Sequence, residues 1–111
     1  MREIKFRGYH EIAGWVAGSY RTNYDDHHAI ADRKLQIEYF VKKESVGQYT
    51  GLKDKNGVEI YEGDVVYIAG YGDYTAEFPF LELYDAVMEN DIGSILGNIY
   101  ENPELLESGN E

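Results

Sequence analysis

Cysteine is absent from the 111-residue sequence, so neither a disulfide framework nor a thiolate metal site can form. No apolar stretch approaches the roughly 20 residues that a membrane-spanning helix needs. The opening Met1–Lys5 is not followed by the apolar run of a signal peptide. We therefore expect a cytoplasmic protein without membrane contact. Its length predicts a single domain over residues 1–111 with a modest core.

Basic residues are missing from the second half of the chain. Residues 1–55 carry all ten Lys and Arg and eight acidic residues, whereas residues 56–111 carry 13 acidic residues and no basic one. Nucleic-acid affinity depends on Lys and Arg displacing counterions, so this half is not expected to bind a duplex. Two interpretations stay open: a surface that confers solubility, or an electrostatic surface for a basic partner.

The motifs of common catalytic sites are also missing. No serine lies in a nucleophile elbow, and Gly70-Tyr71-Gly72 lacks the third glycine and the helix start of a dinucleotide-binding loop. Turn formation accounts for Asp54 and Asp64, and solvent exposure accounts for Glu59 and Glu62. The sequence therefore predicts no catalytic residues, no cofactor and no enzymatic activity.

A metal site is the one alternative to consider, at Asp25, Asp26, His27 and His28. Imidazole and carboxylate together suit zinc or manganese. However, adjacent residues rarely converge on one ion, and the i, i+4 spacing of zinc enzymes is absent. We expect Thr22–Asp32 to be a surface loop, with a metal site as the weaker hypothesis.

Strand-like patterns dominate the chain. Alternating or β-favouring runs predict strands at Glu3–Arg7, Trp15–Tyr20, Arg33–Lys42, Val46–Thr50, Val58–Tyr61, Val65–Ile68 and Ile92–Tyr100. In Val58–Tyr61 the alternation predicts Ile60 on the buried face and Tyr61 on the exposed one. A flexible loop is expected at Ala69–Tyr74.

Turn residues are densest between the fourth and sixth of these strands. Asp54, Asn56 and Gly57 form a strong hairpin signal, because Asp bonds its own downstream backbone and Asn and Gly tolerate positive φ. Gly63 and Asp64 predict a second tight turn.

One helix interrupts the strands. Apolar residues from Phe80 to Val87 recur at i, i+3, i+4 and i+7, and Pro79 suits a first turn, so we expect an acidic amphipathic helix over Pro79–Asn90. Two β runs separated by a bend are the alternative for this stretch. Asn102-Pro103 predicts a short terminal helix through Leu106. The fold class is mainly β: a small twisted antiparallel sheet or partly open SH3-like barrel, with one late helix and a short C-terminal helical turn.

Three blocks resemble a known family. They are VGQYTGLKDKNGVEIYEGDVV at Val46–Val66, the opening MREIKFRG with Gly14–Val16, and Gly97–Leu106. In this order they resemble the YopX-like family of phage and prophage proteins. The resemblance implies a small, mostly β, phage-borne protein of a bacterial host cell, and it brings no catalytic residues with it.

Tyrosine is abundant, with 11 residues. Tyrosine suits protein interfaces, stacking on single-stranded bases beside a cationic groove, or simply strands. The residues predicted to make partner contacts are Trp15, Tyr49, Tyr61, Tyr67, Leu105 and Leu106.

Our first hypothesis is a non-enzymatic phage accessory protein that acts through protein–protein contacts as a homo-oligomer, with a host or phage protein as a further partner. The first alternative is an acidic decoy that occupies a host nucleic-acid-binding protein. The second alternative is a single-stranded nucleic-acid binder that uses the basic residues Arg2, Lys5, Arg7 and Arg21.

Overall fold

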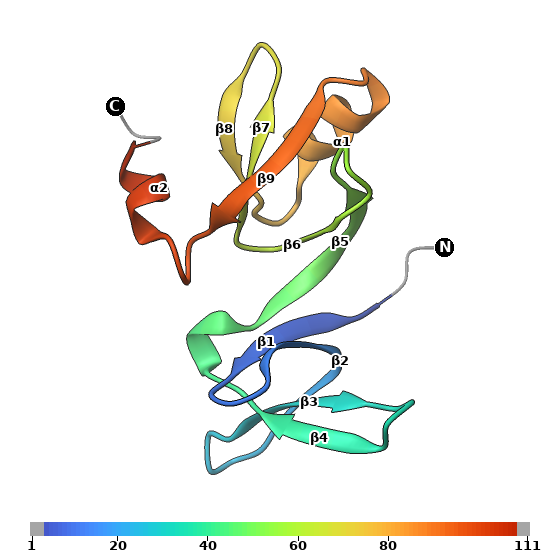
Figure 1. Ribbon diagram of the computed structural model, residues 1–111, viewed down its shortest axis with the longest axis vertical. Helices are drawn as coiled ribbons and strands as arrows, with labels where there is room; N and C mark the ends of the chain where they lie inside the picture. Colours follow the sequence, from blue (N-terminus) through green and yellow to red (C-terminus); the bar gives the residue numbers. More distant parts are fainter. Residues whose placement is uncertain (1–3, 109–111) are drawn as a thin grey trace. The chain divides into compact units, whose positions relative to one another are not determined.

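The computed structural model describes residues 4–108, with the side chains of residues 4–105. The chain forms two compact units, Met1–Tyr49 and Thr50–Glu111. Both are built mainly from antiparallel strands (Figure 1). The predicted fold class, mainly β with a late helix and a short C-terminal helix, is confirmed. The expectation of a single domain over residues 1–111 stays a prediction.

The first unit is an antiparallel sheet in which the first four strands are neighbours in chain order. Its strands are β1 (Phe6–His10), β2 (Gly14–Thr22), β3 (His28–Asp32) and β4 (Ile37–Phe40), and a 3-10 helix, η1 (Lys43–Ser45), leads to β5 (Gly47–Lys53). The first residues of β5 pair with the other edge of β1. The amide of Lys42 donates to the carbonyl of Tyr9 at 3.0 Å, so the chain just after β4 returns to β1.

A close backbone approach explains one glycine of this unit, Gly18. A Cβ on Gly18 would lie 2.1 Å from the carbonyl oxygen of Ala31, which no side chain can tolerate. The core of the unit includes Ile30, which is fully buried. The hydroxyl of Ser45 accepts a hydrogen bond from the amide of Tyr9 at 2.7 Å and fixes η1 against β1.

The second unit contains a three-stranded sheet in the order β8-β7-β9. Its elements are the second part of β5, β6 (Glu59–Tyr61), β7 (Asp64–Ile68), β8 (Gly72–Thr75), α1 (Leu81–Met88), β9 (Ile92–Asn98) and α2 (Pro103–Ser108) (Figure 1). Burying apolar surface drives this packing. The core cluster consists of Ile60, Val66, Ile68, Tyr74, Ala76, Phe80, Leu83 and Ala86.

Two expected loops are wrong in part. Thr22–Asp32 is a loop only as far as His27, because β3 follows and buries His28, Ala29 and Ile30. Ala69–Tyr74 is likewise a short turn followed by β8. In both cases pairing with a neighbouring strand decides the conformation, and local propensity does not.

Several predicted boundaries also need correction. The first strand begins at Phe6 and continues to His10, and Glu3 lies outside the described residues. The third predicted strand, Arg33–Lys42, contains a turn up to Gln36, whose φ is +55°, before β4 begins.

The burial of β6 and the start of α1 also differ from the sequence predictions. Ile60 is buried as expected, but Tyr61 is only 6% exposed, so β6 is covered on both faces. Helix α1 begins at Leu81, because Phe80 adopts a left-handed conformation with φ of 63°. Pro79 therefore precedes the helix and does not occupy its first turn.

Candidate functional site

Two of the four candidate metal ligands meet, and they bind each other. His28 Nε2 lies 2.9 Å from Asp26 Oδ1, and His28 Nδ1 lies 2.6 Å from the hydroxyl of Tyr20. The hydrogen bond from His28 lowers the pKa of the Asp26 carboxyl, and the charge of Lys43 lowers it further. Both nitrogens of the nearly buried imidazole are thus occupied by protein groups.

The other two candidates lie apart from this pair. The side-chain oxygen of Asn23 accepts hydrogen bonds from the backbone amides of Asp25 and His27, and these bonds shape the loop. The ring of His27 lies against Phe40, with centroids 5.8 Å apart. Within residues 4–108, no group of three or more His, Asp or Glu is arranged to hold a metal ion.

The chain from Tyr20 through His28 to Asp26 has the composition of a hydroxyl–imidazole–carboxylate relay. Its hydroxyl belongs to a ring that packs against Phe6, with centroids 5.4 Å apart. The groove beside the β2–β3 loop is lined by Arg21, Thr22, Asn23, His27, Ala29, Glu38 and Phe40, and by no member of the relay. The arrangement therefore fixes β3 against β2, since it satisfies the polar atoms of a buried histidine.

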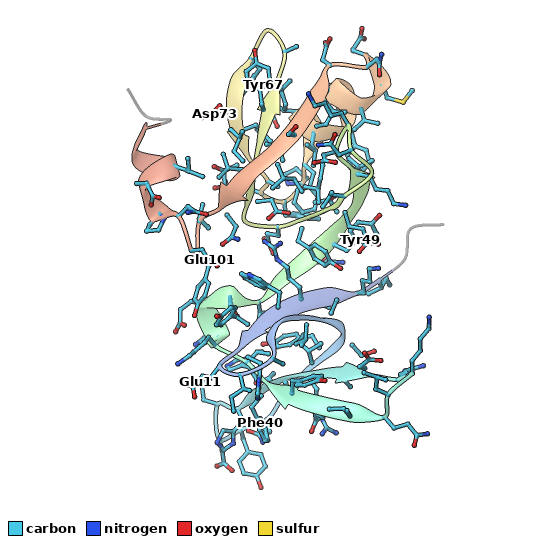
Figure 2. The ribbon with its side chains drawn as sticks, viewed as in Figure 1. Glu11, Phe40, Tyr49, Tyr67, Asp73 and Glu101 are labelled. Atoms are coloured by element: carbon cyan, nitrogen blue, oxygen red, sulfur yellow. The ribbon has the colours of Figure 1, made fainter. Side chains whose placement is uncertain are left out.

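The aromatic residues predicted to contact a partner differ in exposure. Tyr49 and Tyr61 are each 6% exposed, whereas Tyr67 is 47% exposed. Tyr67 lies opposite Asp73 on the β7–β8 hairpin (Figure 2). Trp15 is partly exposed, and the guanidinium of Arg7 lies 4.5 Å from its ring centroid.

The terminal leucines form the rest of that predicted set. Leu105 is partly exposed on α2 and packs close to Gly97, where an added Cβ would lie 2.9 Å from Leu105 Cδ1. The side chain of Leu106 lies outside the described residues, as does Arg2 of the predicted cationic groove. That these leucines and aromatic residues contact a partner stays a prediction.

Strand β4 is an edge of the sheet of the first unit. Large apolar side chains are exposed along it and just before it: Leu35 by 61%, Ile37 by 43% and Phe40 by 63%. A groove of about 260 Å³ separates this edge from the β1–β2 turn. Figure 2 labels Phe40 on the strand and Glu11 in that turn. An open edge of this kind is a template for pairing with another strand.

A second surface feature lies in the second unit. A groove of about 290 Å³ runs between α1 and the β7–β8 turn. The apolar side chains that line it are Ile68, Ala69, Tyr71 and Ala86, and its acidic ones are Glu82, Asp85, Glu89 and Asp91. We call this feature the acidic groove. No local sequence pattern predicts that the acidic residues of α1 lie beside Tyr71.

Charge divides sharply between the two units. The first unit has eight basic and seven acidic residues, and the second has two basic and fourteen acidic residues.

The pKa of Tyr74 lies above its ordinary value, first because the ring is buried and then because Glu82 is near. The charge of Glu82 therefore acts on the buried ring of Tyr74.

These features define a small, cysteine-free, mainly β protein with an open sheet edge and an acidic groove. The chain matches the family described as YopX protein over residues 5–107, and it belongs to that family. Searches of curated proteins and of solved structures found no match. None of the helices between residues 4 and 108 has the length and apolar character to span a bilayer.

Proposed function

We propose that this YopX-family protein is a phage or prophage accessory protein that acts through protein–protein contacts, without catalysis, as a homo-oligomer. Strand β4 carries this proposal, because it combines an open edge with exposed apolar side chains. A second copy of β4 is the occupant that fits it.

The backbone groups available on the edge follow from the pairing of β4 with β3. Tyr39 lies opposite Ile30, and the Val41 amide donates to the carbonyl of His28 at 2.9 Å. Because polar groups alternate in direction along a strand, Glu38 and Phe40 direct their N–H and C=O groups away from β3.

The two ends of the edge limit the register. Gln36 has a φ of +55° and cannot continue a ladder. The amide of Lys42 is already bonded to Tyr9. Two copies of β4 can then pair antiparallel in one register, in which Glu38 lies opposite Phe40 of the other copy and Tyr39 lies opposite its own equivalent on a two-fold axis.

Charge does not oppose this contact locally, since the first unit has eight basic and seven acidic residues. Each copy contributes the outward groups of two residues, which gives about four intermolecular hydrogen bonds. In this register Phe40 of each copy lies against the Arg21–Glu38 ion pair of the other copy. The exposed ring of Phe40 and the aliphatic stem of Arg21 then lose contact with water.

Cysteine cross-linking tests the register directly, because the natural chain has no cysteine. Directly opposed residues have Cα atoms about 4.5–5.5 Å apart, within the range of a disulfide. We expect Tyr39→Cys to form a disulfide-linked dimer under mild oxidation. Glu38→Cys and Phe40→Cys should each cross-link poorly alone and efficiently when the two variants are mixed.

The control is Met88→Cys, at a side chain that is 84% exposed and belongs to the other unit. Cross-linking of Tyr39→Cys at the control rate, with no gain on mixing the other two variants, contradicts the β4 interface. Analytical ultracentrifugation of the natural chain provides the second measurement. A monomer at about 100 µM protein contradicts self-assembly, because micromolar affinity would populate the dimer there.

A further inference from the structure

The acidic groove is independent of β4 and lies wholly within the second unit. Its floor is apolar, since Ile68 is 5% exposed and Ala86 is 4% exposed. Tyr71 forms a wall with 61% of its side chain exposed, and its ring meets that of Tyr74 edge-on, with centroids 5.8 Å apart. The groove therefore offers an aromatic face held by a buried neighbour.

Four carboxylates surround that floor: Glu82, Asp85, Glu89 and Asp91, all exposed. The chain has no Lys or Arg after Lys55, so this negative charge has no basic neighbour nearby in the sequence.

The positions of two of these acids, Asp85 and Glu89, are unfavourable for the helix itself. Glu89 is the C-cap of α1, Asp85 lies in its last turn, and that turn contains no basic residue. The C-terminal end of a helix carries a partial negative charge, which acidic side chains there repel. A local cost to stability at an exposed groove is typical of a site shaped for a ligand.

We propose that the acidic groove binds a segment of another protein that carries several Lys or Arg side chains. The carboxylates pair with the cationic groups, while the aliphatic stems of Lys or Arg cover Ile68 and Ala86. The exposed ring of Tyr71 accepts a guanidinium on its face. This inference does not rest on the proposed self-assembly, because it uses different residues of a different unit.

Self-association does not supply this partner. Each chain has a net charge of −11, and the first unit offers only one more basic than acidic residue. A distinct, strongly basic segment is the charge-complementary occupant. The segments by which proteins contact nucleic acid have this composition.

Calorimetry with a defined peptide tests the proposal. The probe is a short peptide of alternating Arg and Leu, and its matched control has every Arg replaced by neutral citrulline. We expect the Arg peptide to bind at low salt with a Kd of about 100 µM or tighter, and to weaken as salt is added. The citrulline peptide should not bind.

Two double variants separate the groove from the general charge of the unit. Asp85→Asn/Glu89→Gln removes two groove carboxylates, and Glu62→Gln/Glu104→Gln removes two exposed carboxylates outside the groove. We expect the groove variant to weaken peptide binding about tenfold and the control variant about twofold or less. Circular dichroism checks that both variants are folded.

Three results overturn the proposal: no binding of the Arg peptide, equal binding of the citrulline peptide, or equal losses in the two double variants. None of these results bears on cysteine cross-linking at Tyr39, so failure here is distinguishable from failure of the self-assembly. Tyr71→Ala gives an additional readout. It should weaken the Arg peptide several-fold without altering the salt dependence, because it removes a ring and no charge.

Discussion

Replacing Asp54 should show how strongly one turn residue holds the second unit together. Its Oδ1 accepts hydrogen bonds from the backbone amides of Asn56, at 2.8 Å, and Val58, at 3.0 Å. Its Oδ2 accepts the amide of Ile95 at 3.1 Å, which joins the turn to β9. Asp54 is 7% exposed, so its removal leaves amide groups partly buried without this acceptor.

The expected size follows from these contacts. A hydrogen bond to a charged group contributes about 1.5–3 kcal/mol, and a stranded buried donor costs a similar amount. We expect Asp54→Ala to lower the free energy of unfolding by about 3 kcal/mol, since water can reach part of the turn. Asp54→Asn retains an acceptor for the turn but presents an NH₂ group to the Ile95 amide, so it should cost about 1–2 kcal/mol.

Urea denaturation followed by circular dichroism provides the assay, with Glu62→Ala as the exposed control. The fluorescence of Trp15 reports separately on the first unit. Coincident shifts of both signals support the predicted single domain, whereas a shift of circular dichroism alone indicates independent units. If Asp54→Ala costs no more than Glu62→Ala, the structural reasoning is refuted.

The pH dependence gives a second check on Asp54. Burial raises the pKa of this carboxyl, but hydrogen bonds from the amides of Val58, Ile95 and Asn56 together lower it below the ordinary value of 3.8. A lowered pKa means that the carboxylate stabilises the fold above pH 3.8 and that this contribution is lost as pH falls through the folded value. The stability difference between the natural chain and Asp54→Asn should therefore shrink in strong acid, and a constant difference contradicts the assignment.

Three further substitutions test local features by urea denaturation. Gly57→Val should cost about 1–2 kcal/mol, because its φ of +82° is strained for a β-branched residue. Gly18→Ala should cost about 3 kcal/mol or prevent folding of the first unit, because the methyl group meets the Ala31 carbonyl. Tyr20→Phe should cost about 1 kcal/mol, because His28 loses a hydrogen-bond partner. For each, a stability within 0.3 kcal/mol of the natural chain, about the error of such measurements, contradicts the stated cause.

Turn chemistry was the most reliable guide to the fold, because it is local. Asp54 bonds amides two and four residues ahead, and Gly57 has positive φ, both within the reach of a short sequence window. Apolar spacing also predicts the helix, although it wrongly includes Pro79, which precedes Leu81. The left-handed Phe80 that sets the helix start has no sequence signature, since its conformation depends on burial in the core.

Strand β3 could not be predicted from its own residues. His28–Asp32 neither alternates nor contains an aromatic run, and it becomes a strand because β2 and β4 pair with it on both sides. The β4 edge and the acidic groove could not be predicted from local sequence either. Exposure of Phe40 depends on which strand lies at the sheet edge, and the acidic groove depends on Tyr71 meeting α1, both of which are long-range outcomes.

The uneven charge makes ionic strength a way to separate the two proposed contacts. Pairing of β4 joins nearly neutral units through backbone hydrogen bonds and apolar surface, while the −11 charge of each chain opposes the approach of a second copy. Added salt screens that repulsion, so self-assembly should strengthen or stay constant. Binding at the acidic groove relies on attraction and should weaken over the same range. In one salt titration only the Arg-peptide complex is therefore expected to weaken, and an equal weakening of the dimer would contradict its assignment to backbone and apolar contacts of β4.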